Sequence, residues 1–139
     1  GNRGPLTVGI DVTAAHGVGD QRNVIGLTVL PTYDLLHNLF IDNDKLQLAL
    51  RYHYAASEDE HGLQFNSRYE QAVASGRGDI YHAGYLGLNY YIFDHHLKLM
   101  VGTQYFSMSG VNEGDEALRN PADRQVDGWE VITGVRLYF

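Results

Sequence analysis

The stretch WEVITGVRLYF, residues 129–139, alternates between apolar and other side chains over its whole length. Successive side chains of a β-strand point to opposite faces, so residues two apart share a face. One face of this stretch would carry Trp129, Val131, Thr133, Val135, Leu137 and Phe139. The other face would carry Glu130, Ile132, Gly134, Arg136 and Tyr138. The pattern predicts a strand with one apolar face and one mixed face.

The same alternation recurs upstream between turn-forming residues, which predicts an all-β chain of about six strands. The expected strands cover approximately residues 6–15, 23–33, 45–56, 79–93, 96–108 and 129–139. The clearest is KLQLALRYHYAA, residues 45–56, whose leucines and tyrosines share one face. Pro31 has no N–H to donate, so we expect it to limit pairing near the end of the second strand.

The composition excludes several classes of protein. No apolar run reaches about 18 residues, so the sequence predicts no transmembrane helix. A net charge of −7 disfavours binding to nucleic acid through the overall field. The chain contains no cysteine, which excludes disulfides and thiolate metal sites. We find no catalytic triad, no metal-ligand spacing and no phosphate-binding glycine loop, so we expect a protein that is not an enzyme and uses no metal or cofactor.

The connections differ in length in a regular way. Residues 58–78 and 109–127 form long polar links, whereas Asp94 and His95 mark a tight turn. Short turns on one side and long loops on the other, with strands of alternating polarity, are typical of an antiparallel transmembrane β-barrel. Two segments, residues 35–41 and 63–70, do not fit this scheme clearly. Residues 35–41 could extend a strand or form a short helical turn at the rim, and residues 63–70 could form a hairpin or a loop over the lumen. Each could also hide a further strand.

Six strands are too few to close such a barrel, because the smallest single-chain barrels have eight. Three explanations are open: missing N-terminal strands, a barrel shared by several chains, or two overlooked strands. We favour the first, because the opening GNRG is typical of an interior cut and no signal peptide precedes it. Residues 1–139 would then form a single barrel domain or the C-terminal segment of one.

The ending formed by Val135, Leu137 and Phe139 resembles the C-terminal signal by which the barrel assembly machinery recognises bacterial outer-membrane proteins. The stretches at residues 30–36, 44–55, 87–105 and 127–139 resemble the C-terminal region of the phosphate-selective porin O and P family. Among these, GLNYYIFDHHLKLM joins two strands through a tight turn in the manner of that family. The resemblance implies the last six strands of a sixteen-stranded, homotrimeric porin in the outer membrane, among lipid and lipopolysaccharide, that passes small solutes, often anions.

The face opposite the leucines would line the channel. The charged side chains expected there are Lys45, Arg51, Lys98, Arg136, Asp11 and Glu130. A row of basic groups in a pore attracts anions, and Arg51 is the member nearest the middle of a strand. The two carboxylates would partly offset the basic groups, and the long loops are acidic. We therefore do not extend phosphate selectivity to this chain.

Two other classes of function fit the same pattern. A small closed barrel in the outer membrane would have no open pore and would act structurally or adhesively through its outer loops. A soluble, lipocalin-like binding barrel would instead point its leucine and valine faces inward and its charged faces outward. The two classes differ from the porin in lumen size and in the side on which the apolar residues lie.

Overall fold

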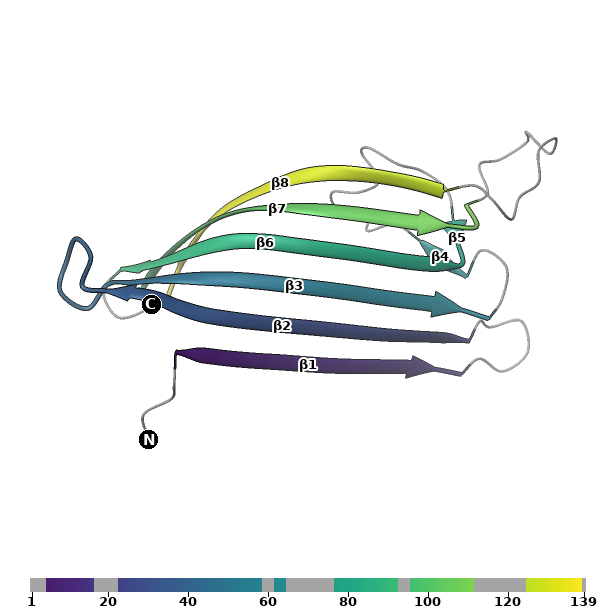
Figure 1. Cartoon of the computed structure of the whole chain (residues 1–139), viewed down its shortest axis with the longest axis horizontal. Helices are drawn as coiled ribbons and strands as arrows, with labels where there is room; N and C mark the ends of the chain where they lie inside the picture. Colours follow the sequence, from purple (N-terminus) through teal and green to yellow (C-terminus); the bar gives the residue numbers. More distant parts are fainter. Residues whose placement is uncertain are drawn as a thin grey trace.

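The computed structural model describes residues 5–16, 23–58, 62–64, 77–92, 96–111 and 125–138. These residues form an all-β structure dominated by one antiparallel sheet of six strands, which follow each other in chain order (Figure 1). The strands are β1 (Leu6–Ala15), β2 (Val24–His37), β3 (Lys45–Ser57), β6 (Ile80–Ile92), β7 (Leu97–Ser109) and β8 (Gln125–Leu137). A short second pair consists of β4 (Leu63–Gln64) and β5 (Arg77–Gly78). The six expected strands are thus confirmed, and within the described residues the sheet keeps two open edges, β1 and β8.

The strand ends differ from the sequence expectation mainly at β2 and β8. The ambiguous segment 35–41 divides: its first part prolongs β2 to His37, and the rest belongs to a turn. β8 begins at Gln125, four residues before Trp129, because β7 continues to Ser109 and offers pairing positions that far. In segment 63–70, only Leu63 and Gln64 are described, and they pair with β5. The expected turn at Asp94 and His95, and residue Phe139, lie outside the described residues.

The pairing of β2 with β3 is interrupted as expected at Pro31. The register runs to the pair Val29–Tyr52 and resumes at Thr32–Ala49, whereas Pro31 is paired with Val8 of β1. Proline lacks the N–H that a central ladder position donates, so it reduces pairing on one side. A second irregularity, a shift between Asp34 and Leu36, inserts one residue into β2. Such a bulge bends the strand locally.

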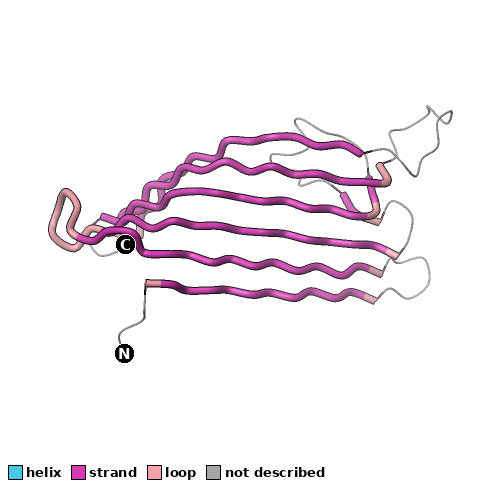
Figure 2. The backbone as a smooth tube through the Cα atoms, in the orientation of Figure 1, coloured by secondary structure: helices cyan, strands magenta, loops and turns pink. Residues whose placement is uncertain are grey.

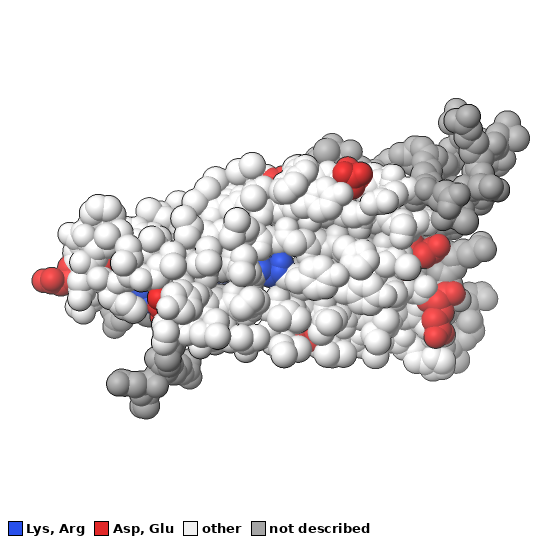
Figure 3. Space-filling view, in the orientation of Figure 1, with Lys and Arg blue, Asp and Glu red and all other residues white. Residues whose placement is uncertain are grey.

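The register sorts the side chains onto two faces of a curved sheet. In Figures 1 and 2 the C-terminal part of β8 bends behind the other strands, so the viewer looks at the convex side. The convex face carries the apolar positions and is exposed, with Ile10 at 68% and Val131 at 77%. Figure 3 shows this side mostly white between its two ends, apart from one basic patch near the middle and a few acidic atoms. The concave face carries the mixed positions and is partly buried, with Gln104 only 4% exposed.

Aromatic residues border the aliphatic part of the convex face. Near one end Tyr105 and Trp129 have ring centroids 5.0 Å apart. Near the other end Phe40 contacts Tyr90 edge to face, with centroids 6.0 Å apart. From Trp129 to Leu137 the strand advances eight residues, or about 26 Å at about 3.3 Å per residue. The convex face is therefore an aliphatic band with an aromatic margin at each end.

A small apolar cluster on the concave side holds the β4–β5 pair. It consists of Leu63, Ala83, Phe106, Met108 and Val111. Gly78 of β5 fits closely, because a Cβ at this position would lie 2.6 Å from the Met108 Cγ and 2.7 Å from the Ser109 carbonyl oxygen. The chain between β3 and β6 therefore turns inward at its two described ends and packs on the concave face.

The turn between β2 and β3 is organised by the carboxylate of Asp44, which is 1% exposed. It accepts hydrogen bonds from the backbone N–H groups of Leu39 (2.6 Å), Phe40 (2.8 Å) and Ile41 (3.1 Å), and from the Tyr90 hydroxyl (2.5 Å). Burial alone would raise the pKa of Asp44, but these hydrogen bonds outweigh it and lower the pKa from 3.8 to about 2. The charged carboxylate therefore fixes the turn that sets the register of β2 on β3.

The change Asp44→Asn should lower the urea midpoint of unfolding at neutral pH, because the amide replaces one acceptor oxygen with a donor. A lowered folded-state pKa means that the stabilisation is present above about pH 4 and is lost as the pH falls through about 2. The wild-type midpoint should thus approach that of Asp44→Asn in acid. Asp42→Asn, an exposed change in the same turn, is the control and should follow the wild type. Equal midpoints for Asp44→Asn and the wild type at neutral pH would contradict this account.

Candidate channel-lining surface

The charged residues expected on one face do lie on one face, the concave one. The register pairs Lys45 with Tyr91, Tyr91 with Lys98, and Lys98 with Arg136, so these side chains form one row across four strands. We call Lys45, Lys98 and Arg136 the basic row. Arg51, Asp11 and Glu130 have the same parity but lie in other rows. The alternation therefore predicted the correct face for these residues. It did not show that Arg51 lies in a different row of paired residues from Lys45, Lys98 and Arg136.

Arg51 and Glu130 are connected through Gln104. The Arg51 Nη2 donates to the Gln104 Oε1 at 2.6 Å, and the Gln104 Nε2 donates to the Glu130 Oε1 at 2.6 Å. This bridge crosses from β3 to β8 over Tyr85, whose ring centroid is 5.2 Å from the Arg51 Cζ. A carboxylate held in the same hydrogen-bonded chain offsets the guanidinium charge. The basic group nearest mid-strand is thus part of a balanced pair.

Two glycines make room for the Tyr85 ring. A Cβ on either Gly87 or Gly102, which are paired across β6 and β7, would overlap the Tyr85 ring. The ring therefore lies flat along the concave face, where its π-face meets the Arg51 cation. In this part of the sheet the two glycines allow an aromatic ring to lie close to the backbone.

The basic row is less balanced than the Arg51 bridge. Lys45 forms an ion pair with Asp34, with Nζ and Oδ2 3.3 Å apart. The Nζ atoms of Lys45 on β3 and Lys98 on β7 each lie 5.0 Å from the centroid of the Tyr91 ring on β6, the strand between them. The Arg136 Nη1 donates to the Tyr138 hydroxyl at 3.1 Å. Among the described residues, neither Lys98 nor Arg136 forms an ion pair, so the row carries excess positive charge.

One sequence interpretation of the charges needs correction. Asp11 was expected to offset the basic groups, but it accepts a hydrogen bond from the Thr13 hydroxyl at 3.1 Å and forms no ion pair with a described residue. The carboxylate paired with Lys45 is Asp34. The expected strand ended at residue 33, one residue before Asp34, whereas β2 continues to His37 and pairs Asp34 with Gln47.

The sequence analysis did not identify a group of amide side chains that lies between the basic row and Arg51 on the concave face. The Gln47 Nε2 donates to the Asp34 Oδ1 at 2.8 Å, and the Gln47 Oε1 accepts from the Asn89 Nδ2 and from the Tyr91 hydroxyl, each at 3.2 Å. Alternation alone places Gln47 and Asn89 on this face. Their mutual contacts require the register of β3 on β6.

A cavity of about 350 Å³ lies on the concave side beside the β4–β5 pair. Its walls include Arg51, His53, Gln64, Tyr81 and Gln104. The Thr28 hydroxyl and the His53 Nδ1 are hydrogen-bonded at 2.9 Å at the adjoining position on β2 and β3. The inward-packed hairpin therefore borders a polar space next to Arg51, of a size that suits a small hydrophilic solute.

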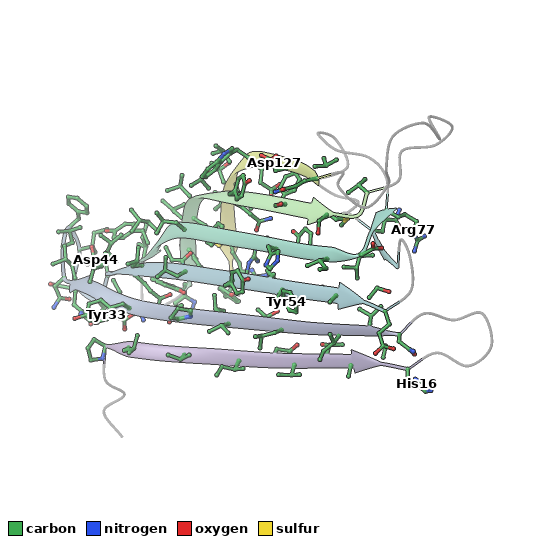
Figure 4. All side chains as sticks on the ribbon, turned by 45° about the vertical axis from the view of Figure 1, so that its right-hand side comes forward. His16, Tyr33, Asp44, Tyr54, Arg77 and Asp127 are labelled. Atoms are coloured by element: carbon green, nitrogen blue, oxygen red, sulfur yellow. The ribbon has the colours of Figure 1, made fainter. Side chains whose placement is uncertain are left out.

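The expected C-terminal signal residues lie on the opposite, convex face. Val135 and Leu137 are 68% and 58% exposed and pair with Leu99 and Leu97 of β7. Phe139 lies outside the described residues. The two ends of the strands are shown in Figure 4, with Asp44 and Tyr33 at one end and Arg77 and His16 at the other.

The change Gln104→Met should destabilise the fold by about 1–3 kcal/mol, because it removes both hydrogen bonds that join Arg51 to Glu130 on a partly buried face. The measurement is the free energy of unfolding in urea. Gln125→Met, at an exposed site where the amide donates only to the Ser107 hydroxyl, is the control and should change stability by less than about 0.5 kcal/mol. Similar losses for both variants would mean that the bridge contributes little.

Neither a metal-binding cluster nor a similar known protein indicates the function of this surface. The described residues contain no group of three or more His, Cys, Asp or Glu side chains placed to hold a metal ion. They also contain no helix long and apolar enough to cross a membrane. Comparisons with protein-family models, with curated proteins and with solved structures found no match to this chain. Its function therefore has to be inferred from its own residues.

Proposed function

We propose that this chain is part of an outer-membrane channel that passes small hydrophilic solutes by diffusion. The observation that carries the proposal is the inverted distribution of polarity. Aliphatic side chains such as Ile10 and Val131 are exposed on the convex face, whereas Gln104 and Asn89 are buried on the concave face. In water such an exposed apolar surface is unfavourable, whereas in lipid the same surface is matched to its surroundings.

The dimensions of the convex face support a membrane location. An aliphatic stretch of about 26 Å along the strand, bordered by aromatic side chains, is close to the apolar band of transmembrane barrels. β3, β6, β7 and β8 each have 13 residues, enough to cross the hydrocarbon layer at the usual tilt. Each of these strands has a Tyr or Trp on the convex face toward one of its ends, namely Tyr54, Tyr90, Tyr105 and Trp129. These residue types are favoured at membrane interfaces.

The two sheet edges imply further strands. β1 and β8 have no outer partner among the described residues. Unpaired backbone groups in lipid cost several kcal/mol each, so a stable barrel needs strands against both edges. We propose that these come from the rest of a porin-like barrel, of which this chain supplies six strands, and that the complete barrels associate as trimers.

The charges on the concave face indicate a preference among permeant ions. Arg51 is balanced by Glu130 through Gln104, whereas the basic row has one close carboxylate, Asp34. A row with excess positive charge in a narrow aqueous space concentrates anions. We therefore propose weak selectivity for anions, determined at the basic row more than at Arg51. The proposal requires no catalytic group and no cofactor.

The alternatives differ on these same points. A soluble, lipocalin-like barrel needs its apolar face inside, and the curvature of the sheet puts that face outside. A small closed barrel in the membrane shares the convex face but fills its interior with side chains. Only conduction of ions separates it from an open channel.

The decisive experiment is a planar-bilayer recording of the natively extracted protein. Stable, stepwise conductance would support the channel. A protein that is inserted and folded but conducts no current would contradict it and would favour the closed structural barrel. Recovery of the folded protein from cells without detergent would instead favour the soluble alternative.

The change Lys98→Gln should reduce the ratio of anion to cation permeability by about twofold, the effect expected of one unit charge acting through water at about 8 Å. The ratio is obtained from the reversal potential in a salt gradient. Lys98→Arg keeps the charge and is the matched control. If Lys98→Gln leaves the reversal potential at the value of Lys98→Arg, while Arg51→Gln shifts it, selectivity is determined at Arg51.

A further inference from the structure

The convex face is not uniformly filled, because a groove of about 520 Å³ crosses it at Gly84. The groove is bordered by Leu50, Tyr52, Leu86, Tyr105 and Trp129 from four neighbouring strands, and Arg51 also contributes to its lining. Its walls are almost entirely carbon. The volume lies within the range of about 300–1,000 Å³ found for small-molecule sites. The groove opens on the face opposite the basic row.

The groove exists because position 84 has no side chain. Gly84 pairs with Tyr52 on one side and with Tyr105 on the other, so two large rings flank an empty position. A Cβ built on Gly84 would have no atom within 4 Å. Neither backbone conformation nor close packing requires glycine here, in contrast to Gly87 and Gly102. The hollow can therefore be filled by a larger side chain without disturbing the sheet.

One end of the groove meets a row of polar side chains on the same face. This row contains His82, Ser107 and Asp127 on three adjacent strands. The Tyr52 hydroxyl and the His82 Nδ1 are hydrogen-bonded at 2.7 Å, and Asp127 lies two residues before Trp129, the partner of Tyr105. Asp127, labelled in Figure 4, carries the only carboxylate among the described strand residues of the convex face, and no Lys or Arg shares that face. A ligand in the groove would thus have an apolar part beside Gly84 and a polar part near an anionic group.

We propose that the groove binds one acyl chain of a phospholipid whose headgroup carries an ammonium group, as phosphatidylethanolamine does. This inference rests on the proposed membrane location. The hydrocarbon chain would lie across Gly84 between Tyr52 and Tyr105. The ammonium group would pair with Asp127, and the headgroup phosphate would accept hydrogen bonds at the Tyr52–His82 side. A headgroup that is only anionic would meet Asp127 with a like charge and would bind less well.

Trp129 provides a direct reporter, because it borders the groove and is the only tryptophan in the chain. The protein is reconstituted in unlabelled lipid, and phosphatidylethanolamine with brominated chains is titrated in. Bromine quenches tryptophan fluorescence only at short range. We expect saturable quenching of Trp129, stronger with bromine near the carbonyl end of the chain, because the groove adjoins the polar row. Brominated phosphatidylglycerol should bind about threefold more weakly, the ratio expected of one exposed ion pair.

Two variants separate the chain site from the headgroup site. Gly84→Leu fills the hollow and should reduce the quenching to a non-saturable dependence on the lipid fraction. Asp127→Asn should keep saturable quenching and abolish the preference for the ethanolamine headgroup. Ala14→Leu adds three carbons at an exposed position of the same face, outside the groove, and should behave like the wild type. Heat-dependent gel mobility of each variant verifies that the fold is retained.

The outcomes distinguish this inference from the proposed function. Quenching that is equal for all lipids and unaffected by Gly84→Leu would overturn the lipid site and leave the membrane location standing. Preferential, saturable quenching by lipopolysaccharide-derived chains, or cross-linking between copies of the chain at Gly84→Cys, would replace the proposed occupant and overturn the inference. Absence of any quenching by bilayer lipid in the wild type would contradict the membrane location itself, and with it the channel.

Discussion

The structure depends on the antiparallel register that joins six strands in chain order. Because side chains alternate strictly along a strand, correct pairing brings every apolar position of neighbouring strands to the same face. A slip of one residue would move a whole set of leucines to the polar face. The carboxylate of Asp44, which fixes the turn between β2 and β3, and the bulge in β2 are local devices that maintain this register.

The same register distributes charge over the concave face. It places Arg51 opposite Tyr85 and within reach of Gln104, whose amide connects it by hydrogen bonds to Glu130. It also aligns Lys98 with Arg136 in one row. Arg51 is thus linked by hydrogen bonds to a carboxylate, whereas Lys98 and Arg136 on the same face are not. For a channel, this difference matters more than the number of basic residues.

The strands and their faces could be predicted because the information is local. Alternation in 45–56 or 129–139 requires only neighbours two residues away, and those strands occur where expected. The start of β8 was misplaced, because Gln125 to Gly128 carry no alternating pattern of their own and are extended by pairing with β7. The contacts among Asp34, Gln47 and Asn89 could not be predicted, because each joins residues from different strands.

The sequence by itself determined the strand content, the polarity of each face and the candidate lining residues, since all of these follow from the two-residue period of an extended chain. The tertiary structure decided which side of the curved sheet is apolar, which carboxylate meets which basic group, and that Gly84 leaves a groove whereas Gly87 and Gly102 accommodate Tyr85. These outcomes depend on curvature and on contacts between strands far apart in the chain. No local pattern encodes them.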